Sequence, residues 1–391
     1  MKIRYMLLHA YGMGGTIRTV INQANHMVAA GHDVEIVSVV RRRKNPHFSI
    51  DPRITVTSLA DQRGGVTRDS LSRRVYRRLR GKVVPAGEFA ASYFTERVEK
   101  AVIDYVSSLD DGILVTTRPA LNLISARHAP EHLVRVAQEH MNLSTHKDDV
   151  REQVVRHYSR LDAVVVLTET DRADYQRILP RARVRRIPNA VDGLGQGPPE
   201  HRDKIVIAAG RLYWQKGFDL LIPAFEEVAR DHPGWRLLIY GTGPKKEELQ
   251  TLIDEHGLHE HVSLMGRSSH FDRELARASV FVLSSRFEGL PMVMIEAMSH
   301  ALAIVSFDCP TGPGDVITHE VDGLLVPPED IGGLAGAMNR LIADPELRRR
   351  LGAEARTAVR RYSPAEVMPA WESLFTELLK ERAGRPGTPE H

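Results

Sequence analysis

The chain has a single cysteine, Cys309, among 391 residues. One thiol excludes an intrachain disulfide and a cluster of thiolate metal ligands, and it fits a reducing cytoplasm. Long hydrophobic runs are missing as well, since no uncharged apolar stretch approaches the roughly 18 residues that a transmembrane helix needs. The opening segment MKIRYMLLHA is interrupted too early for a signal peptide, so we expect a first buried strand there and a cytoplasmic protein.

Aromatic residues are also few, at 6% of the chain, and no nucleic-acid motif accompanies the basic residues. The net charge of +3 hides an asymmetry, because residues 1–190 hold 31 Lys and Arg against 20 Asp and Glu, and the remainder holds 22 against 30. The basic excess is concentrated in Arg41–Lys44 and in residues 69–82, where three apolar residues recur at helical spacing among arginines. A basic amphipathic helix of this kind predicts peripheral contact with an anionic membrane surface or an anionic acceptor. A solvated basic face is the alternative, and nucleic acid is not expected as a partner.

Apolar runs alternate with helical patterns in two successive series. The first series is Ile3–Leu8, Val34–Val40, Ile113–Val115, Leu133–Ala137 and Ala163–Leu167. The second series is Lys204–Ala209, Arg236–Tyr240, Val262–Met265, Val280–Leu283 and Ala303–Ser306. Two αβ series predict an α/β fold with two doubly wound parallel sheets, each a Rossmann-like domain.

The domain boundary is expected where periodicity stops. Residues 188–203, PNAVDGLGQGPPEHRD, are rich in Gly, Pro and polar groups and predict a linker. The N-terminal domain is then 1–187 and the C-terminal domain 204–365. An amphipathic helix over 366–382 is expected to pack back on the N-terminal domain, and 383–391 to be a disordered tail.

Two acids stand in the stretch RFEGLPMVMIEAM, as Glu288 and Glu296. The apolar run before it predicts a buried strand, and Met292–Ser299 is compatible with a helix, with Pro291 suited to the first helical position. Backbone N–H groups at that helix N-terminus, near Gly289, Leu290 and Met292, favour an anion. The acids accept hydrogen bonds only, so sugar hydroxyls are natural partners. The alternative is a helix-capping Glu288 and a solvated Glu296.

Glycine-rich or basic turns follow three other predicted strands. Tyr11–Arg18, YGMGGTIR, lets the backbone approach a ligand, although it lacks the third glycine of a dinucleotide fingerprint and a plain tight turn is the alternative. In Gly210–Gly217, GRLYWQKG, Arg211 and Lys216 are close enough in sequence to hold one diphosphate. The third turn is Gly241–Pro244, GTGP, which we expect to shape the same crevice.

Together these motifs resemble the retaining glycosyltransferases of the GT-B fold, in particular the large family 4 of bacterial glycan assembly. In chain order they are G-G-x-x-R, IPNAVD, G-R-x4-K-G, YGTGP and E-G-L-P-x4-E-A-M. The resemblance covers most of the chain and is most specific over 186–330. The stretch SFDCPTGPGDVI with Asp322–Val326 is similar to the branch that builds cell-surface glycans from UDP-sugars.

The resemblance implies roles for the two acids and the two basic residues. Glu296 would hold the nucleotide ribose, and Glu288 would meet the donor sugar. Arg211 and Lys216 would bind the diphosphate and stabilise the charge that builds on it as it leaves. The amides around Gly289 and Leu290 would lie against the diphosphate or the hexose.

The glycines and one histidine complete the implied site. Gly14 and Gly15 would close over the diphosphate from the other domain, across a deep cleft. Gly241 and Gly243 would line the donor pocket. His140 matches a histidine that the family places beside the donor sugar, with His146 as a competing match.

One departure from the family pattern lies after the second acid. Relatives commonly carry a Gly and a Pro where this chain has Ala301 and Ala303. The departure puts the phosphate contacts of this loop in question and leaves the acids and basic residues unchanged.

The sequence therefore predicts a retaining hexosyltransferase that needs neither a metal nor a cofactor. The expected partners are a nucleoside-diphosphate sugar, with UDP as the expected nucleotide, and a glycan or lipid-linked acceptor at the inner face of the membrane. A sugar-nucleotide 2-epimerase on the same fold and a non-catalytic membrane-associated binding protein are the alternatives.

Overall fold

The computed structural model describes residues 1–65, 83–193 and 201–384. The chain divides into two compact units: unit 1 is Met1–Ala190 with the C-terminal residues from Pro364, and unit 2 is Val191–Ser363. No helix in the described ranges is long and apolar enough to cross a membrane. The basic segment 69–82, and the membrane contact predicted for it, lie outside the described residues.

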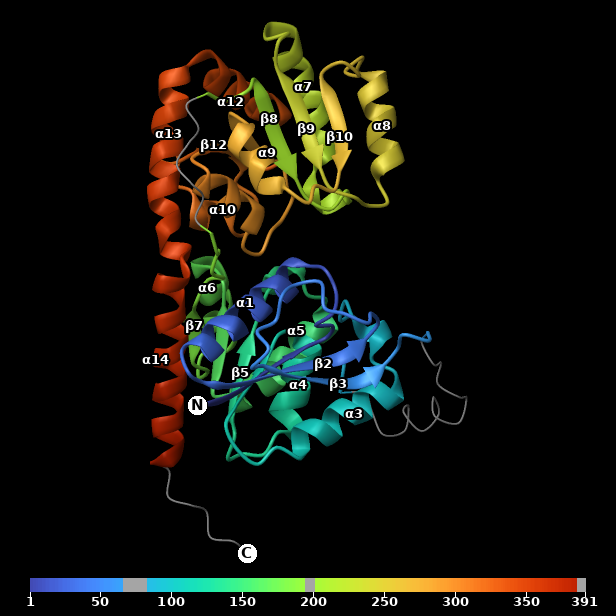
Figure 1. Cartoon of the computed structure of the whole chain (residues 1–391), viewed down its shortest axis with the longest axis vertical. Helices are drawn as coiled ribbons and strands as arrows, with labels where there is room; N and C mark the ends of the chain where they lie inside the picture. The colour runs from blue at the N-terminus through green and yellow to red at the C-terminus, as the bar shows by residue number, and fades with distance from the viewer. Residues whose placement is uncertain (66–82, 194–200, 385–391) are drawn as a thin grey trace, which may run out of the picture. The chain divides into compact units, whose positions relative to one another are not determined.

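Unit 1 is a seven-stranded parallel sheet with the strand order β3-β2-β1-β4-β5-β6-β7 (Figure 1). The strands are β1 (Lys2–Leu7), β2 (Asp33–Arg41), β3 (Thr55–Asp61), β4 (Ile113–Thr116), β5 (Val134–Gln138), β6 (Ala163–Val166) and β7 (Val184–Arg186). The helices are α1 (Gly15–Ala29), α3 (Glu96–Ser107), α4 (Pro119–His128), α5 (Asp148–His157), α6 (Glu169–Ile178) and α14 (Pro364–Ala383).

Unit 2 repeats this plan in a six-stranded sheet with the order β10-β9-β8-β11-β12-β13. Its strands are β8 (Ile205–Ala209), β9 (Arg236–Tyr240), β10 (Val262–Gly266), β11 (Val280–Leu283), β12 (Ala303–Phe307) and β13 (Leu324–Val326). Its helices are α7 (Phe218–Asp231), α8 (Lys246–Glu255), α9 (Phe271–Arg277), α10 (Met292–Ser299), α11 (Pro313–Val316), α12 (Ile331–Ala343) and α13 (Pro345–Ala358).

The central strands form because their apolar, mostly β-branched runs are buried on both faces. Every residue of β4, β5, β6, β8, β11 and β12 is buried. Helices on both sides of a parallel sheet remove such strands from water, and continuous apolar runs are the sequence pattern that results. The two predicted doubly wound sheets are thus confirmed.

The strands that the sequence did not reveal are β3, β7 and β13, each at or near the edge of a sheet. Most of β3 is only partly buried, and β7 has one buried residue out of three. An edge strand is covered on fewer sides, so it needs fewer apolar residues and its sequence carries a weaker pattern.

Helix α14 belongs to unit 1 although it ends the described chain. Val367, Trp371 and Phe375 are buried in the same core cluster as Ile3 and Tyr5 of β1. The helix contacts α1 and β5 (Figure 1). These large side chains tie the last helix to the first strand, so the two ends of the described chain stabilise one unit.

Candidate donor site

The order of the strands locates a ligand site in unit 2. In the sheet, β8 lies between β9 and β11. The chain continues from β8 to β9 in one direction, and from β11 to β12 in the opposite direction. The order therefore reverses between β8 and β11. In open parallel sheets, ligands bind outside the carboxyl ends of the strands at such a reversal. The loops that leave these two ends, 210–217 and 284–291, carry the motifs that the sequence singled out.

An ion pair joins the two loops. The Lys216 ammonium donates to Oε1 of Glu288 over 2.6 Å, and the Ser285 hydroxyl donates to the same oxygen over 2.5 Å. The side chains of Lys216 and Glu288 are 18% and 7% exposed. A charged hydrogen bond with so little water around it is strong, so each residue holds the other in place at the mouth of the sheet.

The backbone brings the lysine to this position. Gly217 has φ +59°, and a Cβ there would lie 1.9 Å from the carbonyl oxygen of Ser284. The Ser284 hydroxyl donates to the Lys216 carbonyl over 2.9 Å. A Cβ at Gly210 would come within 3.0 Å of the Lys216 methylenes. The two glycines of G-R-x4-K-G are therefore required by close contact along the lysine stem and between the two loops.

Arg286 also connects the same two loops, and sequence reasoning assigned it no role. Its guanidinium donates twice to the Asp219 carboxylate, over 2.8 and 2.7 Å, and to the Trp214 carbonyl over 2.8 Å. Its Nε also lies 2.8 Å from a carboxylate oxygen of Glu329. Trp214 and Asp219 thus anchor the loop after β11 to the loop after β8 and the start of α7, and Glu329 joins it to the turn before α12.

The glycine turn after β9 packs directly on the loop after β8. A Cβ at Gly241 would lie 1.8 Å from the Gly210 carbonyl oxygen, and one at Gly243 would lie 2.2 Å from that of Leu212. Leu212 in turn donates its amide to the Thr242 carbonyl over 3.1 Å. These contacts need glycine, so Gly241 and Gly243 shape the loop that carries the basic residues.

Arg211 is placed differently from Lys216. It is exposed, and its guanidinium lies 5.6 Å from the centre of the Tyr213 ring. No carboxylate is paired with it in the described chain. Its charge is therefore available to an anionic ligand, whereas the charge of Lys216 is already shared with an acid.

The start of α10 presents two of the three amides expected to face an anion. The amides of Gly289 and Leu290 donate no backbone hydrogen bond within the described chain, but the Met292 amide donates to the Leu290 carbonyl over 2.8 Å. Pro291 is not in the first helical turn, because it precedes the helix with ψ +77°. The tight turn around the proline consumes the Met292 amide, so that part of the expectation is wrong.

Glu296 and the departure after it can now be placed. Glu296 is half-buried, about one turn into α10. Ala301 has φ +55°, the left-handed conformation that glycine adopts more easily, and Ala303 begins the buried strand β12. This chain therefore keeps the backbone conformation that suits the family's glycine while carrying a Cβ there.

The remaining predicted residues belong to unit 1. Gly14 precedes α1 and Gly15 begins it, and a Cβ on Gly15 would meet nothing within 4 Å. His140 follows β5 by two residues, and neither of its ring nitrogens has a hydrogen-bond partner among the described residues. Burial lowers the pKa of His140 to about 4, so the ring is neutral at pH 7. A neutral imidazole can donate from one nitrogen and accept at the other.

A buried acid lies beside this histidine. Glu139 accepts hydrogen bonds from Tyr158 over 2.5 Å and from Asn122 over 2.7 Å. Burial raises the pKa of Glu139 to about 7. His146 lies 3.9 Å from its other oxygen, and burial lowers the pKa of His146 to about 4. The competing histidine is thus part of a buried polar cluster, which favours a structural role for it.

Comparison with known proteins identifies the family. The family model described as glycosyl transferases group 1 matches residues 195–358. An amylovoran biosynthesis glycosyltransferase of Erwinia amylovora is 30% identical over 61% of this chain and 68% of its own length. The chain belongs to the group 1 glycosyltransferases. An exopolysaccharide phosphotransferase of Streptomyces coelicolor is 36% identical over 98% of this chain, which spans 41% of that protein.

A solved structure shows that the fold is GT-B. A variant of S. aureus TarM, crystallised with Fondaparinux, alpha-GlcNAc-glycerol and UDP, matches with a TM-score of 0.76. The match covers 96% of this chain and 99% of TarM at 17% identity. In the present chain, the residues matched by the family model include both loops at the reversal of the unit 2 sheet.

Proposed function

We propose that this glycosyltransferase moves a hexose or N-acetylhexosamine from a UDP-sugar to a hydroxyl acceptor, with retention, in cell-surface glycan biosynthesis. The observation that carries the proposal is the Lys216–Glu288 pair at the carboxyl ends of β8 and β11. It places a cation and a hydrogen-bond acceptor side by side, as a donor with an anionic diphosphate and a neutral sugar requires. The amylovoran relative supports the glycan assignment, and the UDP in the TarM crystal supports the nucleotide.

Lys216 supplies charge to the leaving diphosphate. Its ammonium has three donors, so it can hold Glu288 and a phosphate oxygen at the same time. Arg211 adds a second cation from the same loop. Both stabilise charge that grows as the glycosidic bond breaks, and this lowers the barrier instead of merely tightening binding. Because these cations serve the diphosphate, the proposed transfer needs no metal.

Glu288 and Glu296 recognise neutral hydroxyls. Glu288 accepts a hydrogen bond from the donor sugar, and Glu296 accepts from the ribose. The acceptor hydroxyl loses its proton to the departing phosphate, so no carboxylate nucleophile takes part. His140 contributes from unit 1 as a neutral donor to the sugar.

The decisive experiment compares two incubations of the purified protein with a panel of UDP-sugars. One contains no acceptor, and the other contains a hydroxyl-bearing glycan acceptor. Transfer only in the second, with the anomeric configuration of the donor kept in the product by NMR, supports the proposal. Release of a free epimer in the first incubation would establish the epimerase instead, and an inverted product would exclude the retaining mechanism. Addition of EDTA should leave turnover unchanged.

The ribose role of Glu296 has its own test. Glu296→Ala should weaken UDP binding by about 1.5–3 kcal/mol, because a charged acceptor is lost. Glu354→Ala, an exposed acid on α13, serves as the control and should bind UDP like the parent. Equal UDP affinity in the Glu296 and control variants, measured by calorimetry, would remove Glu296 from the nucleotide site. Glu288→Ala should instead lower turnover more than UDP affinity.

A further inference from the structure

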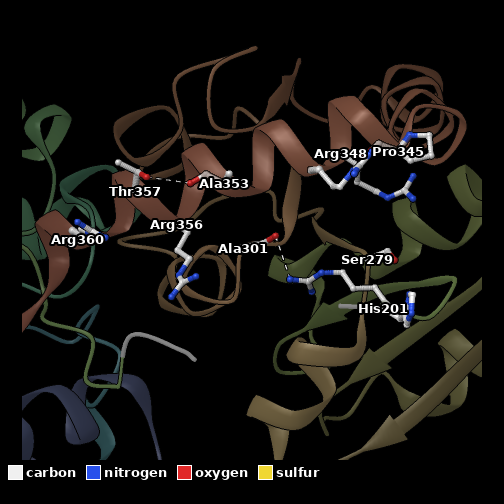
Figure 2. Close-up of a pocket in the computed structure, with 11 residues that line it drawn as sticks. His201, Ser279, Ala301, Pro345, Arg348, Ala353, Arg356, Thr357 and Arg360 are labelled. Carbon is white, nitrogen blue, oxygen red and sulfur yellow. Dashed lines mark hydrogen bonds between the residues drawn. The ribbon is translucent and has the colours of Figure 1, made fainter. Parts of the chain in front are cut away.

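Unit 2 contains a pocket at the opposite edge of its sheet from the donor site. It has a volume of about 760 Å³ and lies along α13 (Figure 2). Ser279 and Ala301, which line it, stand just before β11 and β12. The amino ends of parallel strands share one edge and the carboxyl ends share the other, so this pocket is distinct from the site that holds Lys216.

The lining of this pocket, called here the α13 pocket, carries charge of one sign. Among the described residues around it there are five arginines and a histidine and no acid. The basic residues are Arg202, Arg348, Arg349, Arg356, Arg360 and His201. A concave surface with charge of a single sign concentrates the opposite charge.

Two of these guanidinium groups are held by carbonyl oxygens. Arg202 donates to the carbonyl of Ala278, at the end of α9, over 2.7 Å, and also to carbonyls at the end of α10. Arg348 donates to the Ile342 carbonyl, at the end of α12, over 3.1 Å. Carbonyl dipoles hold the groups but do not neutralise them. Burial lowers the pKa of both, yet an arginine stays charged in proteins.

Two others, Arg356 and Arg360, have no ion-pair partner within the described residues. Figure 2 shows both on the segment that also carries Thr357, with Ala301 and Ser279 across from α13. They are four residues apart, at the end of α13 and in the 3-10 turn Val359–Tyr362. Arg349, by contrast, is already paired with Glu346.

We propose that the α13 pocket binds a soluble anion with at least two phosphate groups. Arg356 and Arg360 both line the pocket and are four residues apart in the chain, so each can take one of two neighbouring phosphates. The guanidinium fork matches phosphate oxygens. Arg202 and Arg348 add positive charge to the same pocket, and the volume lies in the range of small-molecule sites. The proposal does not rest on the glycosyl-transfer activity.

The test is calorimetric titration of the full chain with inorganic tripolyphosphate. Arg356→Ser/Arg360→Ser should weaken binding by tenfold or more, whereas orthophosphate should bind the parent at least tenfold more weakly than tripolyphosphate. The control, Arg236→Ser/Arg350→Ser, removes the same charge from exposed residues of unit 2 that do not line the pocket, and it should bind within about twofold of the parent. Thermal unfolding by circular dichroism verifies that each variant is folded.

Further arms separate the other sources of binding. Tripolyphosphate can also enter the donor site, so Lys216→Ala should leave one tripolyphosphate site whose affinity still depends on Arg356 and Arg360. Tripolyphosphate binding that is equal in the pocket and control variants, or absent from the parent, would overturn the proposal. Co-sedimentation with anionic phospholipid vesicles that is lost in the pocket variant alone, without tripolyphosphate binding, would assign the arginines to a membrane instead.

Discussion

The ion pair between Lys216 and Glu288 can be measured by a double-mutant cycle in the ligand-free protein. Coulomb's law for two unit charges at the observed 2.6 Å gives about 1.6 kcal/mol in water and about 6 kcal/mol at a dielectric constant near 20. The side chains are 18% and 7% exposed, so the interaction energy of the pair lies between these two limits. Hydrogen bonds to charged groups contribute about 1.5–3 kcal/mol. We therefore expect a coupling free energy of about 2–3 kcal/mol.

The variants are Lys216→Met and Glu288→Gln, because glutamine keeps the shape and can still accept from Ser285. Urea unfolding of the two single variants, the double variant and the parent gives the coupling. The control cycle uses Lys245 and Glu248, an exposed ion pair three residues apart on unit 2, which should give no more than about 0.5 kcal/mol. A coupling below 0.5 kcal/mol for Lys216 and Glu288, or one equal to the control, would refute the view that each residue positions the other.

Three other predictions concern stability and turnover. Gly352→Ala should lower the free energy of unfolding in the same urea assay, because its Cβ would lie 2.3 Å from the Ala301 carbonyl oxygen. Gly336→Ala, in an open position on α12, should instead raise the free energy of unfolding by about 0.5–1 kcal/mol. Arg286→Met should lower kcat and the melting temperature together, since the loops after β8 and β11 lose a common anchor, and a variant with normal kcat would remove that role. Glu139→Gln should gain stability relative to the parent as pH rises from about 4.5 to 7, because the raised pKa of the carboxyl makes the parent lose stability over that window; parallel curves of stability against pH would contradict the assignment.

The sequence determined the features that depend on neighbours in the chain. Buried parallel strands are apolar whatever lies beside them, so β9 and β11 could be bounded to the residue. An alternation of strands and helices places every following loop at one edge of a sheet. That rule, together with the resemblance to the glycosyltransferase family, predicted that Lys216 and Glu288 would share a site, although they are 72 residues apart.

Tertiary structure decided what depends on contacts between distant segments. Arg286 meets Asp219 across 67 residues, and no local pattern distinguishes it from a solvated arginine. The α13 pocket likewise joins Arg202, which precedes β8, to Arg356 near the end of the unit. At the start of α10, one turn hydrogen bond engages the Met292 amide but not the amides of Gly289 and Leu290. This bond depends on the ψ angle of Pro291. Side-chain type and spacing fix which groups are available, but only packing fixes which of them remain without a partner for a ligand.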